Sequence, residues 1–171
     1  DRMKIVEGNK PVIATIHGAA YAAGCQLAAS CDLAYSTTTA TFATPGVNIG
    51  LFCSTPMVAV SRKINRKPMM KMLLTGEPIK ANFAKQIGLI NDHFQKNKLN
   101  KEVLNIAKKI SSKSNLTIKI GKRAFYKQLE MPLNKAYKYT SEMMTLNMMA
   151  MDAKEGISEF LEKRSPKWKH R

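Results

Sequence analysis

Residues 11–36 constrain the fold of this chain most strongly. Residues 12–16 are a short apolar run, rich in β-branched side chains, that follows a proline and has the pattern of a buried strand. His17 and Gly18 end that run, and small, helix-compatible residues dominate residues 22–30. The sequence therefore predicts a strand, a tight turn and a helix in direct succession.

The first turn of the predicted helix can hold a negatively charged oxygen atom. Backbone N–H groups in that turn lack partners inside the helix and lie at the positive end of its dipole. Ala22, Ala23 and Gly24 carry no side chain large enough to keep a ligand carbonyl away. We therefore predict a backbone site for an oxyanion here. The alternative is that these small residues only let the strand and the helix pack closely.

Several stretches of the chain match a known family in order. Lys-Pro-Val-Ile-Ala (residues 10–14), the run from His17 to Ala28 and Cys-Asp-Leu-Ala (residues 31–34) resemble the central motif of the crotonase (enoyl-CoA hydratase/isomerase) superfamily. The further matching stretches are residues 41–50, 74–79, 86–90 and 160–164. Together they cover nearly the whole chain.

This resemblance implies an α/β fold of the crotonase/ClpP-like type. Residues 1–95 are expected to form the C-terminal part of a β-β-α spiral core, and residues 96–171 a helical oligomerisation region. The polar residues 95–100, rich in lysine and asparagine, are expected to link the two. Because the chain begins with Asp1 and not with Met, we interpret it as a fragment whose earlier spiral turns and any transit peptide lie upstream.

The resemblance also implies roles for residues at the predicted helix turn and in the next loop. Crotonase enzymes hold a thioester oxygen with two backbone N–H groups; Ala23 matches one donor, Gly24 allows close backbone approach, and the other donor lies upstream. Hydratases carry glutamates where this chain has Gln26 and Gly46. Glutamine cannot exchange a proton near neutral pH, and glycine has no side chain to offer. Since acid–base catalysis contributes about 10²–10⁴ in rate per group, the sequence argues against ordinary hydratase activity.

Four other residues are candidates for binding the substrate. Asn48 and Ser54 follow Gly46 in the loop and can line the acyl pocket, although no His or carboxylate stands nearby in the sequence to activate them. Phe160 and Lys163 match family positions that contact the nucleotide end of coenzyme A, often from a neighbouring subunit. Lysine suits that role as a point charge against phosphate. The alternative for Lys163 is an ordinary solvent-exposed lysine.

Residues after 100 show helical periodicity. We predict helices over residues 101–112, over residues 115–129 with Asn115 as cap, and from Pro132 onward. Asp152 followed by Glu155 is typical of a capping box that opens a last helix. In that helix an apolar face is expected to point inward; its residues are Ile157, Phe160 and Leu161.

A methionine-rich face between Leu133 and Met148 is expected to be part of the core. Methionine also suits surfaces that pack against partners. The resemblance points to the C-terminal helices that hold crotonase trimers together. It therefore implies an identical subunit as partner, in a homotrimer or a dimer of trimers.

The formal charge of +16 can be interpreted in three ways. These are lysine-rich solvated faces, attraction of a phosphorylated ligand such as coenzyme A, and binding of nucleic acid. The basic residues are spread along the chain without the aromatic residues of an RNA-binding motif, which makes nucleic acid the least favoured. No apolar run approaches the roughly 20 residues of a membrane span.

The cysteines argue against a metal site. Cys25, Cys31 and Cys53 are odd in number and lack Cys-x-x-Cys spacing, so neither a disulfide framework nor a zinc site is expected. Cys25 is either a small packed residue, which we favour, or a thiol whose pKa is lowered by the helix N-terminus. A reducing compartment follows from this cysteine usage. The resemblance narrows the compartment to the mitochondrial matrix.

These observations favour an acyl-CoA-binding, hydratase-like protein of mitochondrial fatty-acid or acyl-CoA metabolism. No permanently bound cofactor is expected, and a coenzyme A thioester would be substrate or ligand. The alternative is a non-catalytic acyl-CoA-binding or regulatory oligomer, and a distant third possibility is an RNA-binding protein.

Overall fold

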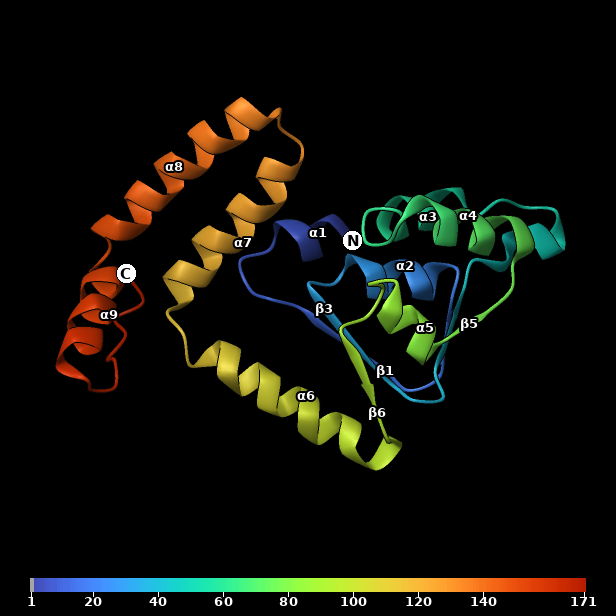
Figure 1. The fold of residues 1–171 in the computed structure, drawn as a ribbon, viewed down its shortest axis with the longest axis horizontal. Helices are drawn as coiled ribbons and strands as arrows, with labels where there is room; N and C mark the ends of the chain where they lie inside the picture. Colours follow the sequence, from blue (N-terminus) through green and yellow to red (C-terminus); the bar gives the residue numbers. More distant parts are fainter. Residues whose placement is uncertain (1) are drawn as a thin grey trace. The chain divides into compact units, whose positions relative to one another are not determined.

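The computed structural model describes residues 2–171, which form two compact units. The first unit comprises residues 2–5 and 12–107, and the second comprises residues 6–11 and 108–171. Helix α1 (Arg2–Glu7) opens the chain (Figure 1). Each unit is described below by itself.

The strands of the first unit form two three-stranded sheets. One sheet has the parallel order β1-β3-β6, and its strands are β1 (Ile13–Ile16), β3 (Leu33–Thr37) and β6 (Asp92–Phe94). The other has the order β2-β4-β5, and its strands are β2 (Ala19–Tyr21), β4 (Thr41–Ala43) and β5 (Ile79–Lys80). In it, β4 pairs parallel to β2 and antiparallel to β5.

The chain alternates between the two sheets and then forms a helix. Strands β1 and β2 lead into α2 (Ala23–Ser30). Strands β3 and β4 then lead through the 3₁₀ helix η1 (Pro45–Ile49) into α3 (Ser54–Val60). This repeated β-β-α order confirms the expected fold class.

Strand β2 was not predicted from the sequence, because a tight turn was expected there. Its residues are Ala19, Ala20 and Tyr21, which pair with Thr41, Phe42 and Ala43. Alanine has little preference for strands, so the pairing with β4 decides the structure of this segment.

Alternate residues of β3 pack on opposite faces of its sheet, as the two-residue period of a strand requires. Leu33 and Tyr35 lie in a cluster with Leu99 and Val103 of helix α6 (Lys96–Ser111). Ala34 lies in the larger core, which also contains the fully buried Phe42 and residues of α2 and α4. The sheet is therefore covered on both faces.

Helices α4 (Arg66–Thr75) and α5 (Ala81–Gln86) complete the first unit. Gly76 ends α4 in a left-handed conformation with φ 65°, which favours glycine. Helix α4 buries Met69, Met72 and Leu73, whereas Met70 and Leu74 are exposed.

Helix α6 begins earlier than the sequence predicted. It includes residues 96–100, which were expected to be a polar linker, so that prediction is wrong. The reason is Leu99, which is fully buried and lies one turn before Val103, so that the two anchor the helix on Tyr35. The structural units divide within α6, after Ala107, whereas the domain boundary after residue 95 stays a prediction.

The second unit contains the helices α7 (Asn115–Leu129), α8 (Leu133–Met149) and α9 (Met151–Glu162). Helices α7 and α8 form a helical hairpin (Figure 1). The N-cap of α7 is Ser114, whose Oγ accepts a hydrogen bond from the N–H of Thr117 at 3.3 Å, so the prediction of Asn115 as cap is off by one residue.

Asp152 does not form the predicted capping box, because it lies inside the first turn of α9 and has other partners. It accepts hydrogen bonds from Ser114 Oγ at 2.5 Å and from the backbone N–H groups of Lys169 and His170 at 2.6 and 2.9 Å. Asp152 therefore ties the C-terminal tail and the start of α7 to α9.

The second unit exposes many large apolar side chains. The expected inward face of α9 is wrong for this chain, since Ile157, Phe160 and Leu161 are 57, 77 and 72% exposed. The methionine-rich face of α8 is likewise not core; its exposed members include Leu133, Tyr137, Met144 and Met148. Across residues 2–171, none of the helices combines the length and the apolar character needed to cross a membrane.

Candidate active site at the start of helix α2

The bend between β2 and α2 has an unusual backbone at Ala22. This residue has φ 46° and ψ −110°, a conformation that costs a non-glycine residue about 1–3 kcal/mol. Its N–H donates to the carbonyl oxygen of Ala43 at 2.9 Å, which joins the bend to the end of β4. The surrounding sheet therefore holds the bend in place against its strain.

The first backbone N–H groups of α2 are available to a ligand. The first hydrogen bond of the helix runs from Gln26 N–H to the Ala22 carbonyl oxygen at 3.0 Å. No acceptor among residues 2–171 bonds the N–H of Ala23 or of Gly24, and both residues are exposed. A Cβ atom built on Gly24 would meet no heavy atom within 4 Å. The bend is thus neither filled by other side chains nor engaged by other acceptors.

Gln26 is buried without a complete set of hydrogen bonds. Its side chain is 6% exposed, and its Oε1 atom has no hydrogen-bond partner among the described residues. The same is true of Thr44 Oγ1, which follows β4 and stands two residues before Gly46. An unpaired buried acceptor costs about 1–3 kcal/mol, so a donor from a bound water or ligand would be stabilised there. Thus the first turn of α2 and the segment that follows β4 each contain a buried polar atom without a partner among the described residues.

Gly46 sits in a loop that leaves no space for a side chain. Its N–H donates to Cys53 Sγ at 3.3 Å, and its carbonyl oxygen accepts from Leu51 N–H at 3.0 Å. A Cβ atom on Gly46 would lie 2.8 Å from the Leu51 carbonyl oxygen and 3.1 Å from Cys53 Sγ. The loop is therefore closed around glycine and cannot present an acid from this position without moving.

Cys25 is a packed residue and not an activated thiol. It is fully buried next to Gly24, and burial, helped by the nearby Cys53, raises the pKa of its thiol to about 12. The alternative of a pKa lowered by the helix N-terminus is wrong, because burial disfavours the charged thiolate and raises the pKa. Among residues 2–171, no group of His, Cys, Asp and Glu side chains could hold a metal ion.

The contacts of Asn48 and Ser54 are with residues other than those of the α2 bend. The amide of Asn48 packs on Gly76, where a built Cβ would lie 2.9 Å from Asn48 Oδ1. Ser54 is the exposed first residue of α3, and its N–H donates to the Phe52 carbonyl oxygen at 2.7 Å. Neither has a hydrogen bond to residues 22–26 among the described residues, so their role in substrate binding stays a prediction.

Phe160 and Lys163 lie at the C-terminal end of α9, in the second unit. Phe160 is exposed, and Lys163 ends the helix in a left-handed conformation with φ 54°. The next residue, Arg164, bonds Glu155 through both Nη atoms at 2.6 and 3.0 Å and Glu162 through Nε at 2.5 Å. These ion pairs fix the turn from which the Lys163 side chain projects.

The family model described as enoyl-CoA hydratase/isomerase matches residues 1–171. The chain belongs to the enoyl-CoA hydratase/isomerase family. A curated relative is the human enoyl-CoA hydratase domain-containing protein 3, mitochondrial, which is 50% identical over 160 residues, covering 94% of this chain and 53% of the relative. The 2,3-dehydroadipyl-CoA hydratase of Escherichia coli (strain K12) is 34% identical over 164 residues, covering 95% of this chain and 64% of that protein.

Solved structures of the crotonase family agree with this fold. An enoyl-CoA hydratase of Mycobacterium smegmatis matches with a TM-score of 0.96 and 46% identity over 98% of this chain and 65% of that chain. Human enoyl-CoA hydratase domain-containing protein 3 matches with a TM-score of 0.95 and 48% identity over 98% of this chain and 66% of that one. The chain spans about half the length of the mouse and human forms of enoyl-CoA hydratase domain-containing protein 3.

Sequence reasoning missed two features of this candidate site. The strained bend at Ala22 had no signal, because a positive φ is expected at glycine and not at alanine. Thr44 stands before Pro45-Gly46 in the matched loop, but its unpaired hydroxyl depends on its burial, which the sequence does not give.

Proposed function

We propose that this chain is part of an acyl-CoA-binding, enoyl-CoA hydratase-like protein of mitochondrial fatty-acid or acyl-CoA metabolism. The observation that carries this proposal is the open bend at Ala23 and Gly24, with N–H groups that have no acceptor among residues 2–171. The family match and the names of the mitochondrial relatives support the choice of ligand and of compartment, the matrix.

The proposed chemistry at the bend is polarisation of a thioester. The N–H of Ala23 donates to the thioester oxygen, and the open space beside Gly24 lets that oxygen approach. Because the bend is held by β4, the donor needs no rearrangement when negative charge develops on the oxygen, and one such donor is worth about 3 kcal/mol in a barrier. Gln26 can orient a water by hydrogen bonding but cannot exchange a proton with it.

The proposed contacts with the nucleotide end of coenzyme A come from α9. Phe160 offers an exposed ring, and Lys163 offers a charge on a turn fixed by Arg164. The exposed apolar side chains of α8 and α9 fit an interface with an identical subunit, in a homotrimer or a dimer of trimers.

A non-catalytic acyl-CoA-binding or regulatory oligomer is the second candidate. The lack of space for any side chain at Gly46 favours it, because the loop is then adapted to the absence of the second acid.

Measurement of crotonyl-CoA binding and hydration by the intact protein tests both candidates. We expect saturable binding, with a hydration rate far below that of a hydratase that has both glutamates. An ordinary hydratase rate would reject our interpretation of Gln26 and Gly46. Failure to bind any acyl-CoA would reject the proposed function itself.

A further inference from the structure

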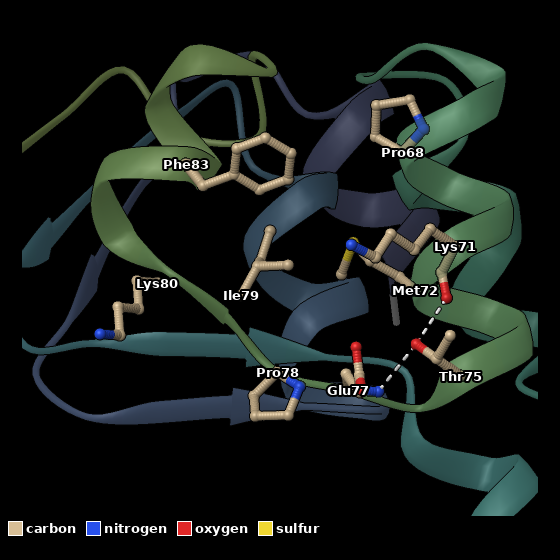
Figure 2. Close-up of a pocket in the computed structure, with 9 residues that line it drawn as sticks. All are labelled: Pro68, Lys71, Met72, Thr75, Glu77, Pro78, Ile79, Lys80 and Phe83. Carbon is tan, nitrogen blue, oxygen red and sulfur yellow. Dashed lines mark hydrogen bonds between the residues drawn. The ribbon is translucent and has the colours of Figure 1, made fainter.

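A cavity of about 330 Å³ lies between α4, β5 and α5, and no residue of the α2 bend lines it. Figure 2 shows the side chains around this cavity, which converge from the helix α4, from the loop after it and from α5. Its lining residues are Pro68, Lys71, Met72, Thr75, Glu77, Pro78, Ile79, Lys80 and Phe83. We call it the α4–α5 pocket.

The centre of the α4–α5 pocket is apolar. Met72, Ile79 and Phe83 surround it (Figure 2). Met72 is 2% exposed and fixed in the core, whereas Phe83 is 41% exposed and forms an outer wall. Such a surface favours an apolar ligand body, and a volume near 300 Å³ is at the small end of ligand pockets.

Of the four polar side chains that line the pocket, Thr75 makes hydrogen bonds within the protein and the other three carry charge. Thr75 Oγ1 donates to the Lys71 carbonyl oxygen at 2.7 Å and accepts from Glu77 N–H at 3.2 Å, so its hydroxyl fixes the loop. The charged ends of Lys71, Lys80 and Glu77 have no ion-pair partner within the part of the chain that the structure describes.

The rim of the pocket carries a small excess of positive charge. Two lysines, Lys71 and Lys80, line it together with one acidic residue, Glu77. A concave surface with an excess of one sign attracts ligands of the opposite charge. The apolar centre and the basic rim together fit a ligand that has an apolar body and one negative end.

We propose that the α4–α5 pocket binds a small amphipathic carboxylate, whose apolar chain packs on Met72, Ile79 and Phe83 and whose carboxylate pairs with Lys71. A straight-chain acid of medium length has the required shape, and octanoate is the probe. Hydrolysis of a thioester is the class of reaction that supplies such an acid. The proposal does not depend on the α2 bend.

The apolar part of the proposal predicts a dependence on chain length. Each additional CH₂ group buried in the pocket strengthens binding about fourfold. This gain should stop when the chain has filled the cavity. A series from butyrate to dodecanoate therefore shows a rise and then a plateau, whereas adsorption to an open apolar surface shows no plateau.

The site can be observed through the methionine methyl groups of the intact protein, labelled with ¹³C and followed by NMR. Met72 lines the pocket, and Met70, on the same helix but outside the pocket, is the internal control. We expect octanoate to shift the Met72 signal saturably and to leave Met70 unchanged. Octanol and octylammonium should bind more weakly. Equal binding of all three, or a shift of Met70 alone, would overturn the proposal.

Two variants and one competitor complete the test. Lys71→Gln should weaken octanoate binding about fivefold and leave octanol binding unchanged, whereas Lys67→Gln, also exposed on α4 but outside the pocket, should change neither. Phe83→Ala should weaken both ligands. An excess of octanoyl-CoA should not displace octanoate from the Met72 site. Displacement, or equal effects of Lys71→Gln and Lys67→Gln, would contradict a separate carboxylate site.

Discussion

The Sγ atom of Cys53 accepts a hydrogen bond from the backbone N–H of Gly46 at 3.3 Å. The same sulfur lies in the core beside Cys25, the residue after Gly24. Through its position beside Cys25, the Cys53 side chain joins the loop after β4 to the first turn of α2. It also explains why the loop surrounds Gly46 so closely.

Gly46→Ala should destabilise the protein by about 1–3 kcal/mol, since the added Cβ would meet the Leu51 carbonyl oxygen at 2.8 Å and the loop would have to move. Gly46→Glu should cost at least as much and should not restore hydration. Chemical denaturation measures the loss. Gly24→Ala is the matched control, because a Cβ there meets nothing within 4 Å, and equal losses in the two variants would contradict the closed loop.

Asp152 should control release of the C-terminal tail. Burial raises the pKa of its carboxyl, but hydrogen bonds from Ser114, Lys169 and His170 outweigh burial and hold the pKa below 3.8. The stability from these bonds is therefore present above the unfolded pKa of 3.8 and is lost as the pH falls through the lower folded pKa.

Trp168, the one tryptophan of the chain, reports this release. Its Nε1 donates to the Ser112 carbonyl oxygen at 2.7 Å. Asp152→Asn should shift its fluorescence to longer wavelength at neutral pH and should remove the acid transition. Glu142→Gln, on the exposed surface of α8, is the control. An unchanged spectrum in Asp152→Asn would reject the role of Asp152.

Arg164 should act as a positioning residue for Lys163. Lys163→Ala is expected to weaken acyl-CoA binding two- to fivefold, the range of an exposed ion pair, with no effect on the corresponding pantetheine thioester. Arg164→Ala should give the same selective loss, because it frees the turn, and Arg164→Lys should restore part of it. Titration calorimetry measures both ligands. Equal losses for both ligands would remove the phosphate contact.

The exposed face of α8 should mediate self-association. Met144→Asp places a charge among exposed apolar side chains and should lower the oligomeric state in sedimentation velocity. Thr145→Asp, at the neighbouring exposed position whose hydroxyl bonds the Ser141 carbonyl oxygen, is the matched control. A stable oligomer in Met144→Asp would exclude this face from the interface.

The sequence predicted those elements whose pattern is local. Strand β1 and helix α2 follow from a β-branched run and a small-residue run, and the bounds of α7 follow from periodicity. Strand β2 could not be predicted, because its alanines become a strand only by pairing with β4. The start of α6 was predicted too late because the polar residues around Leu99 were interpreted as a linker, although Leu99 lies one turn before Val103.

The candidate site likewise contains features that follow from local sequence and features that only the folded chain creates. The positions of Ala23 and Gln26 follow from the helix turn. The space at Gly46, by contrast, depends on the Leu51 carbonyl oxygen and on Cys53, which only the folded loop brings there. Asp152 fits a local capping pattern, yet its partners are distant in the sequence. Ser114 precedes α7, and Lys169 and His170 follow α9.

Replacing the backbone amide of Ala23 by an ester, with the α-hydroxy analogue of alanine, should test the oxyanion site directly. The change removes one N–H donor and keeps the side chain. We expect acyl-CoA binding to weaken about fivefold, the worth of one hydrogen bond. In addition, the infrared carbonyl band of bound crotonyl-CoA labelled at C1, which the intact site should shift to lower frequency, should move back toward its position in water.

The same backbone change at Lys67 is the control for this experiment. Lys67 lies in the first turn of α4, where an N–H group also lacks a partner inside the helix, and it is outside both proposed sites. The Lys67 ester should leave the binding and the carbonyl band unchanged. If the Ala23 ester also leaves both unchanged in a folded protein, the thioester oxygen does not rest on this amide, and the open bend serves only the packing of β2 against α2.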